Sequence, residues 1–166
     1  FGTTSSFWNA GVFLGSFLII TALLDTLHPA LEALASQAQR DGLTGLLNDR
    51  TFRERCAPAF ALAARHRRTL ALGYIDLDGF KPINDDLGHL VGDGVLEQVS
   101  TRLRHSVRAS DTAARFGGDE FVVLCEDTDA AAAVSVAERI RSEIRRPLAG
   151  AATDFPLTAS VGVVVY

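Results

Sequence analysis

The sequence predicts an α/β domain preceded by a membrane-spanning helix and a linker helix. Apolar strand patterns alternate with helical patterns over residues 41–166, which is typical of a layered α/β domain, whereas residues 1–24 contain no charged side chain. The 166 residues carry a net charge of −4 and are 48% hydrophobic, which indicates one domain with an appendage. The mild acidity argues against a surface that binds nucleic acid.

The appendage begins with the apolar stretch Phe7–Leu24. As a helix it would be about 27 Å long, close to the thickness of a bilayer, so residues 1–24 are predicted to contain a transmembrane helix that anchors the chain in the inner (cytoplasmic) membrane. A buried helix of a soluble domain and a signal peptide are the alternatives, and the signal peptide lacks a basic n-region and a cleavage site. Residues 25–40 are expected to form a signalling linker helix, either a short coiled coil or an amphipathic helix that packs on its own domain.

The remaining elements follow from apolar periodicity and capping residues. One helix is expected to bury Val95, Leu96, Val99 and Leu103 on a single face. Cys56 and Cys125 have no ligand-spaced neighbours and are expected to be small buried hydrophobes in a reducing compartment. The predicted segments are helices over Asp49–His66, Pro82–Asp86, Val91–Val107 and Asp129–Arg145, strands over Leu70–Leu77 and Leu157–Val164, and a hairpin with Ala113–Phe116 and Phe121–Leu124 as its strands.

The tip of this hairpin carries the chain's most informative motif, in which Gly117 and Gly118 are followed at once by Asp119 and Glu120. Glycines let backbone N–H groups approach a ligand closely, and clustered carboxylates favour a hard cation such as Mg²⁺. Backbone donors together with Mg²⁺ describe a site for a nucleoside triphosphate. The alternative is an ordinary solvated Gly-Gly-Asp turn.

A second acidic segment begins at Asp76, where a buried strand pattern ends in Asp-Leu-Asp-Gly-Phe-Lys. With Asp41-Gly-Leu-Thr-Gly-Leu-Leu-Asn48, these motifs resemble the GGDEF family of diguanylate cyclases, which condense two GTP into cyclic di-GMP. The resemblance implies a GGDEF domain over residues 41–166 with the nucleotidyl-cyclase palm fold, a central and mostly antiparallel sheet flanked by helices. The family normally continues past Tyr166 into a further helix and strand that supply basic residues. The chain is therefore expected to be a C-terminally truncated fragment whose activity depends on that part.

Phosphodiester formation needs a deprotonated 3′-hydroxyl and charge compensation on the phosphates, which two carboxylate-held metal ions can provide. Mg²⁺ or Mn²⁺ is assigned to Asp76, Asp119 and Glu120, and the resemblance adds the carbonyl of Leu77. Either Glu120 or Asp119 accepts the hydroxyl proton, and the sequence does not separate these roles. The turn after the strand is expected to bind phosphates through backbone N–H groups and one cation, while the hairpin glycines leave room for the nucleotide. The residues expected to bind phosphate are Gly79, Phe80 and Lys81, with Lys81 also assigned a catalytic role.

Two further groups take their roles from the resemblance. Asn84 and Asp93 match the positions that read guanine, and helix capping is their alternative role. Arg108 and Asp111 match an Arg-x-x-Asp product-inhibition site, with Arg139 as the partner arginine; a surface ion pair is the alternative.

Together the motifs predict a membrane-tethered diguanylate cyclase that converts two GTP into cyclic di-GMP and two pyrophosphates across a homodimer. The alternatives are a cyclic di-GMP receptor without turnover and an adenylyl-type cyclase, which Asn84 and Asp93 disfavour. One departure from the family is Asn48-Asp49-Arg50, where Asn-Arg-Arg is usual, and it puts in doubt any charged contact near the linker.

Overall fold

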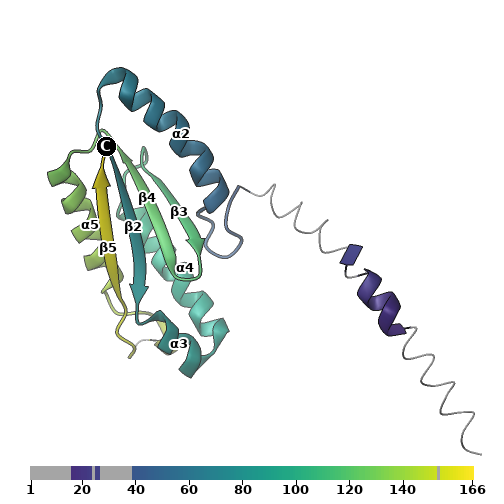
Figure 1. Cartoon of the computed structure of the whole chain (residues 1–166). Helices are drawn as coiled ribbons and strands as arrows, with labels where there is room; N and C mark the ends of the chain where they lie inside the picture. The colour runs from purple at the N-terminus through teal and green to yellow at the C-terminus, as the bar shows by residue number, and fades with distance from the viewer. Residues whose placement is uncertain (1–15, 24, 27–38, 153) are drawn as a thin grey trace, which may run out of the picture. The chain divides into compact units, whose positions relative to one another are not determined.

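The computed structural model describes residues 16–23, 25–26, 39–152 and 154–166. The chain divides into two compact units, Phe1–Ala38 and Gln39–Tyr166. Figure 1 shows the second unit as a twisted sheet with helices packed against it. Its elements are, in chain order, β1 (Leu47–Asn48), α2 (Asp49–His66), β2 (Leu70–Asp78), α3 (Phe80–Leu87), α4 (His89–His105), β3 (Thr112–Gly117), β4 (Glu120–Glu126), α5 (Ala130–Ile144), the 3₁₀ helix η1 (Gly150–Ala152) and β5 (Thr158–Val165).

In the first unit, residues 16–23 are helical. The large apolar side chains on this segment are exposed, among them Phe17, Leu18, Ile19, Ile20 and Leu23. Within the described residues, no helix is both long enough and apolar enough to cross a membrane. Residues 7–15 and 24 of the predicted span, and residues 27–38 of the predicted linker helix, lie outside the described residues, so both remain predictions.

The five strands form one sheet in the order β1-β3-β4-β2-β5. Strand β1 pairs with β3 in parallel, and every other pairing is antiparallel, which confirms the mostly antiparallel sheet expected from the sequence. Strand β2 lies between β4 and β5, and β3 and β4 form the predicted hairpin. The two-residue β1 was not predicted.

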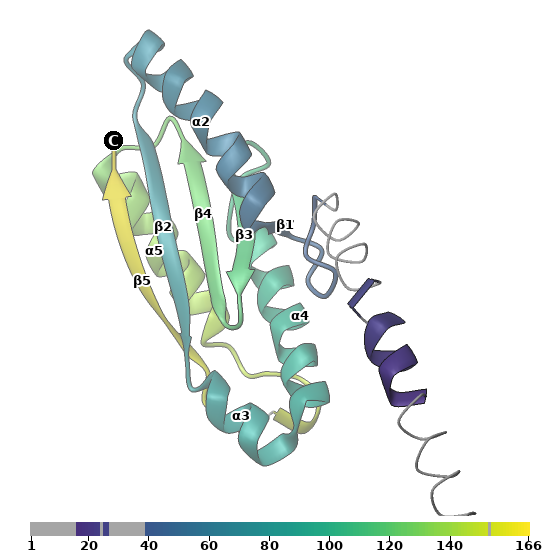
Figure 2. The same cartoon turned by 45° about the vertical axis from the view of Figure 1, so that its right-hand side comes forward.

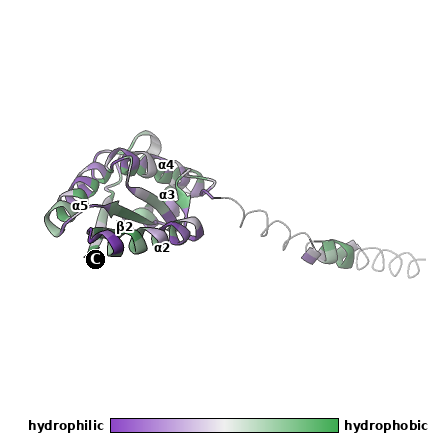
Figure 3. Ribbon diagram, turned by 90° about the horizontal axis from the view of Figure 1, so that it is seen from above, coloured by the Kyte–Doolittle hydropathy of each residue, from purple (hydrophilic) through white to green (hydrophobic). Residues whose placement is uncertain are grey.

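Helices cover both faces of the sheet, with α2 on one face and α4 and α5 on the other, while α3 lies at the end of the sheet where β2 stops (Figures 1 and 2). A hydrophobic core lies on each face of the sheet, and successive side chains of β2 point alternately into one and the other. Leu70 packs in the core beneath α2, while Ile75 and Leu77 pack in the core to which α3–α5 contribute. Figure 3 shows hydrophobic residues in the sheet and, around it, helices that carry both hydrophilic and hydrophobic residues. Sequence periodicity correctly places Val95, Leu96, Val99 and Leu103 in the core.

Helix α2 has the predicted bounds because Asn48 caps it, accepting a hydrogen bond from the Thr51 N–H at 2.9 Å. Asp49 occupies the first turn, where a negative charge suits the helix dipole, and it forms an ion pair with Arg53 at 2.6 Å. This pairing within the helix gives the unusual Asp49 a local structural role.

The other helices start near their predicted positions. Helix α3 begins two residues before Pro82 and α4 two residues before Val91. Asp129 caps α5 by accepting the Ala132 N–H at 2.8 Å. Cys125 is buried and Cys56 half-buried, and both are free thiols.

Candidate active site

Two carboxylates face each other where β2 ends and β4 begins. Asp76 and Glu120 are direct partners in the antiparallel β2–β4 register, so their side chains lie on the same face of the sheet, with Cβ atoms about 4.5–5.5 Å apart. Both residues are exposed. Like charges placed directly opposite each other are destabilising unless a cation lies between them. This arrangement therefore favours a bound metal ion.

Asp119 is placed differently from these two. It lies in the hairpin turn, is half-buried, and its carbonyl accepts a hydrogen bond from the Leu77 N–H at 3.3 Å. In the described part of the chain, no three Asp, Glu, His or Cys side chains gather closely enough to hold a metal ion by themselves. Mg²⁺, however, commonly uses one or two carboxylates and completes its shell with water and substrate phosphates. Asp76 and Glu120 fit that type of site.

Tyr74 is a member of this site that the sequence analysis missed. It lies two residues before Asp76 on β2 and therefore on the same face. The Tyr74 hydroxyl donates a hydrogen bond to Glu120, and this bond, with the charges of Glu120 and Asp76, raises the pKa of Tyr74. Its ring packs edge-on against Phe116, with centroids 6.1 Å apart. A polar aromatic residue two positions before the strand-end aspartate was the available signal.

The glycines of the hairpin turn leave open space. Gly117 and Gly118 have φ angles of 149° and 49°, which side chains rarely adopt. A Cβ added at either position would meet no atom within 4 Å. The space beside the turn is thus free for a ligand, and the backbone conformation itself favours glycine.

Arg115 holds this turn in place. Its Nε and Nη2 atoms donate to the Gly118 carbonyl at 3.1 and 2.8 Å, and Nη1 donates to the Asp41 carboxylate at 3.2 Å. Partial burial acts to raise the pKa of Asp41, but hydrogen bonds from the Thr44 hydroxyl and N–H and the nearby Arg115 guanidinium lower it overall. This ion pair joins the segment Asp41–Asn48 to the hairpin that carries the Gly-Gly-Asp-Glu motif. The sequence did not predict it.

The turn between β2 and α3 is built around Gly79, whose φ is 90°. A Cβ there would come within 2.9 Å of the Pro156 carbonyl oxygen, so a side chain does not fit. Helix α3 starts at Phe80 without a side-chain cap, and Lys81 is exposed in its first turn. The uncapped backbone N–H groups and the lysine are suited to phosphate, as predicted for this segment.

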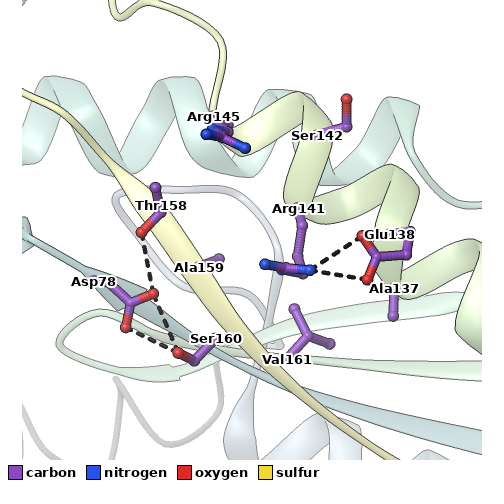
Figure 4. A pocket seen from close by; sticks show the side chains of 10 residues that line it. All are labelled: Asp78, Ala137, Glu138, Arg141, Ser142, Arg145, Thr158, Ala159, Ser160 and Val161. Carbon is purple, nitrogen blue, oxygen red and sulfur yellow. Dashed lines mark hydrogen bonds and ion pairs between the residues drawn. The ribbon is translucent and has the colours of Figure 1, made fainter.

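A cavity of about 680 Å³ lies between α5 and β5, and Figure 4 shows the side chains around it. Asp78 lines this cavity, where its carboxylate accepts hydrogen bonds from the hydroxyls of Thr158 at 3.2 Å and Ser160 at 3.0 Å (Figure 4). On the helix side Arg141 pairs with Glu138 at 2.9 Å. Asp78 thus ties β5 to the end of β2, directly before the turn around Gly79.

Asn84 and Asp93 are brought close together by the α3–α4 corner. The Asn84 side chain lies directly against Gly92, the residue before Asp93, where an added Cβ would collide with it. Neither residue caps a helix, since Gly79 precedes α3 and Gly88 lies between α3 and α4. An amide and, one residue along from its contact, an exposed carboxylate therefore occur at the same corner.

The Arg-x-x-Asp loop follows α4. Its Asp111 accepts the Arg108 N–H through Oδ2 at 2.8 Å, while Oδ1 is buried with no hydrogen-bond partner in the described structure. Arg139 of α5 donates to the Ser106 carbonyl at 2.8 Å. All three charged side chains act on Cys125, whose pKa is raised to about 11 mainly by burial. The three predicted inhibitory-site residues are thus grouped at one end of α4.

The model of the family described as "Diguanylate cyclase, GGDEF domain" matches residues 38–166. The chain is 39% identical over 146 residues, 88% of its length, to the bifunctional diguanylate cyclase/cyclic di-GMP phosphodiesterase MucR of Pseudomonas aeruginosa, of which it covers 21%. It is 41% identical over 138 residues, 81% of its length, to diguanylate cyclase TpbB of the same organism, of which it covers 31%. The chain belongs to the GGDEF diguanylate cyclase family and spans about a fifth to a third of these relatives' lengths.

Solved structures agree with this assignment. A sensory box/GGDEF family protein from Caulobacter crescentus matches with a TM-score of 0.73 and 38% identity, covering 78% of this chain and 84% of that one. The GGDEF domain of DgcB from Caulobacter crescentus, solved in complex with cyclic di-GMP, matches with a TM-score of 0.73 and 32% identity over 78% of each chain. The fold is therefore that of a GGDEF cyclase domain.

Proposed function

We propose that this domain is a diguanylate cyclase that joins two GTP into cyclic di-GMP and releases two pyrophosphates. The observation that carries the proposal is the facing pair Asp76 and Glu120 beside the open Gly117–Gly118 turn. Two exposed carboxylates without a cationic partner among the described residues, next to bare backbone, suit a Mg²⁺-bound triphosphate. Family membership supports a nucleotidyltransferase, and the intact Gly117-Gly118-Asp119-Glu120 motif supports turnover rather than ligand binding alone.

In the proposed reaction, the 3′-oxygen of one GTP attacks the α-phosphorus of the other. The bond to pyrophosphate breaks, and pyrophosphate leaves with the electron pair. Glu120 or Asp119 accepts the hydroxyl proton, directly or through water. The N–H groups at Gly79 and Phe80, with Lys81, neutralise negative charge on the β- and γ-phosphates, which favours departure of the leaving group.

A divalent ion, Mg²⁺ or Mn²⁺, would be held by Asp76 and Glu120, with the Leu77 carbonyl and Asp119 as further candidate ligands. When bound, such an ion polarises the phosphate and lowers the pKa of the attacking hydroxyl. Tyr74 donates to Glu120 and so orients that carboxylate.

Guanine selection is assigned to Asn84 and Asp93. The Asp93 carboxylate can accept the N1–H and N2–H₂ donors of guanine, and the Asn84 amide can donate to O6. Because adenine presents a different pattern, these two residues would remain unpaired with ATP, which costs binding energy.

Each domain offers one GTP site, so the proposed reaction requires a two-fold dimer in which two hairpins face each other. The apolar helix at residues 16–23 supports the proposal that the amino-terminal segment anchors the chain in the inner membrane, with the catalytic domain in the cytoplasm where GTP is present. The linker over residues 25–40 would then control the geometry of the dimer.

The test compares Glu120→Gln with Glu126→Gln, the same change at the other end of β4. Cyclic di-GMP formation from GTP and Mg²⁺ should fall by orders of magnitude for Glu120→Gln and stay near the parent value for Glu126→Gln. Binding of Mn²⁺ with a non-hydrolysable GTP analogue, followed by electron paramagnetic resonance, should show the same difference. A folded Glu120→Gln variant with parental metal binding and turnover would contradict the proposal.

A second candidate function is a cyclic di-GMP receptor that binds through Arg108, Asp111 and Arg139. The unpartnered Oδ1 of Asp111 favours a ligand at this loop. Binding of cyclic di-GMP without any turnover of GTP would support the receptor, whereas both activities together indicate a product-inhibited cyclase. Arg108→Ala should abolish inhibition in the latter case.

A further inference from the structure

A second cavity, of about 310 Å³, lies beside the Arg-x-x-Asp loop. Four arginines from different segments line it: one before β1, one on α2, one near the end of α4 and one on the loop itself. These are Arg40, Arg55, Arg104 and Arg108. Asp111 is the one carboxylate among the lining residues, so the cavity is strongly cationic.

These guanidinium groups are not neutralised within the described structure. Arg40 donates to the Gly45 carbonyl at 2.6 Å and Arg104 to the Thr44 carbonyl at 3.5 Å, but neither forms an ion pair with a described carboxylate. No hydrogen bond or ion pair joins the Arg55 side chain to any described residue. Several other arginines of the domain do have carboxylate partners, namely Arg50, Arg53, Arg68, Arg115, Arg141 and Arg146.

Four arginines beside a single carboxylate, Asp111, leave an excess of positive charge that indicates an anionic ligand. Guanidinium groups bind phosphate through forked hydrogen bonds. The free Oδ1 of Asp111 in the same cavity needs a donor, which the N–H edge of a guanine provides. A ligand that satisfies both requirements carries a guanine base and a phosphate group.

We propose that Arg40, Arg55 and Arg104 form a phosphate subsite that extends the Arg108–Asp111 site, and that its ligand is cyclic di-GMP. The guanine lies at Asp111 and Arg108, and a phosphodiester lies among the three additional arginines. This inference rests on the proposed product-binding function of the loop. It assigns to this chain three ligand-binding residues that the Arg-x-x-Asp motif does not include.

Binding of cyclic di-GMP to the whole chain is measured by calorimetry for the parent, Arg55→Gln, Arg104→Gln and Arg108→Ala. Arg55→Gln is the decisive variant, because its side chain has no partner to lose and glutamine is a good helix former. We expect Arg55→Gln to bind cyclic di-GMP roughly tenfold more weakly than the parent, a size typical of one charge-assisted hydrogen bond. Its affinity should also depend less on salt concentration. The matched control is Arg145→Gln, an exposed arginine that lines the other cavity and should bind as the parent does.

The outcomes separate this inference from the proposed function. If Arg108→Ala loses binding while Arg55→Gln and Arg104→Gln bind as tightly as the parent, the product site stands and the subsite is wrong. If the parent does not bind cyclic di-GMP, the proposed product site fails, and pyrophosphate without metal is then the probe of the subsite. Pyrophosphate binding that Arg55→Gln weakens would support a phosphate subsite for a free phosphate ligand; no binding would overturn it.

Discussion

Arg115 shows how a single side chain can set the geometry of the hairpin turn at the candidate active site. Its guanidinium joins the Gly118 carbonyl to the Asp41 carboxylate, and the two side chains of this ion pair are only 13% and 25% exposed. A partly buried ion pair of this kind contributes more than a surface pair, because removing one partner leaves the other without its counter-charge.

Replacing Arg115 by alanine should therefore lower the free energy of unfolding by about 1.5–3 kcal/mol, the range for hydrogen bonds to charged groups. Arg115→Lys should recover little of it, since an ammonium cannot reproduce the fork. Urea unfolding measures the free energy of unfolding of both variants. The control is Arg68→Ala, which breaks the exposed pair with Asp127 and should cost less than about 1 kcal/mol. Equal losses for the two alanine variants would show that Arg115 is an ordinary surface cation.

The same ion pair predicts a dependence on pH. The pKa of Asp41 is lower in the folded protein than its ordinary value of 3.8, so the folded state favours the ionised form. The contribution of Asp41 to stability is complete above about pH 5 and disappears as pH falls through the folded pKa. The stability difference between the parent and Asp41→Asn should thus shrink between pH 5 and about pH 2. A difference that stays constant over this range would exclude the linkage.

At the scale of elements, local patterns predicted most of the helices and strands. Helix α2 was placed correctly because its cap and periodicity are local signals, and the β3–β4 hairpin because its glycines are adjacent. Strand β1 has two residues, too few to show a period, and pairs with a strand far along the chain.

The candidate site was predictable only in part. Asp76, Asp119 and Glu120 were all expected beside one another near strand ends, and the register pairs Asp76 with Glu120 while Asp119 lies in the turn. Their role as metal ligands stays a prediction. Asp41 and Arg115, however, lie 74 residues apart, and no pattern in the sequence links them. The four-arginine cavity likewise depends on how separate segments pack, which periodicity does not describe.

The α3–α4 corner provides a test of guanine recognition at this scale. In Gly92→Ala the new Cβ would displace the Asn84 side chain, whereas a Cβ at Gly94 on the same helix meets nothing within 4 Å. Gly94→Ala should raise helix stability by about 0.5–1 kcal/mol and leave GTP binding unchanged, whereas Gly92→Ala should weaken binding of GTP because Asn84 has to move. Calorimetry with a non-hydrolysable GTP analogue and its ATP counterpart, which has an amino group in place of O6, measures the effect. If both variants bind the guanine analogue as the parent does, Asn84 does not read the base.

At the scale of the whole domain, one short turn contacts both candidate sites. In segment 41–46, the carbonyls of Gly45 and Thr44 accept hydrogen bonds from Arg40 and Arg104, respectively. Both arginines line the cationic cavity. The same segment holds the catalytic hairpin through Asp41 and Arg115. Because this turn directly follows the predicted linker, it is well placed to connect an input signal, product binding and the hairpin.

The proposed reaction also constrains how chains must cooperate. One domain positions one GTP, so two chains have to meet before either bond forms, and the initial rate should rise more than linearly with chain concentration. An excess of Glu120→Gln should trap parent chains in mixed dimers, in which the intact half forms one bond and the altered half fails to form the second. A linear dinucleotide should then accumulate in place of cyclic di-GMP, which chromatography of the products resolves. A rate strictly proportional to the parent concentration, with cyclic product at every mixing ratio, would mean that a single chain completes the reaction.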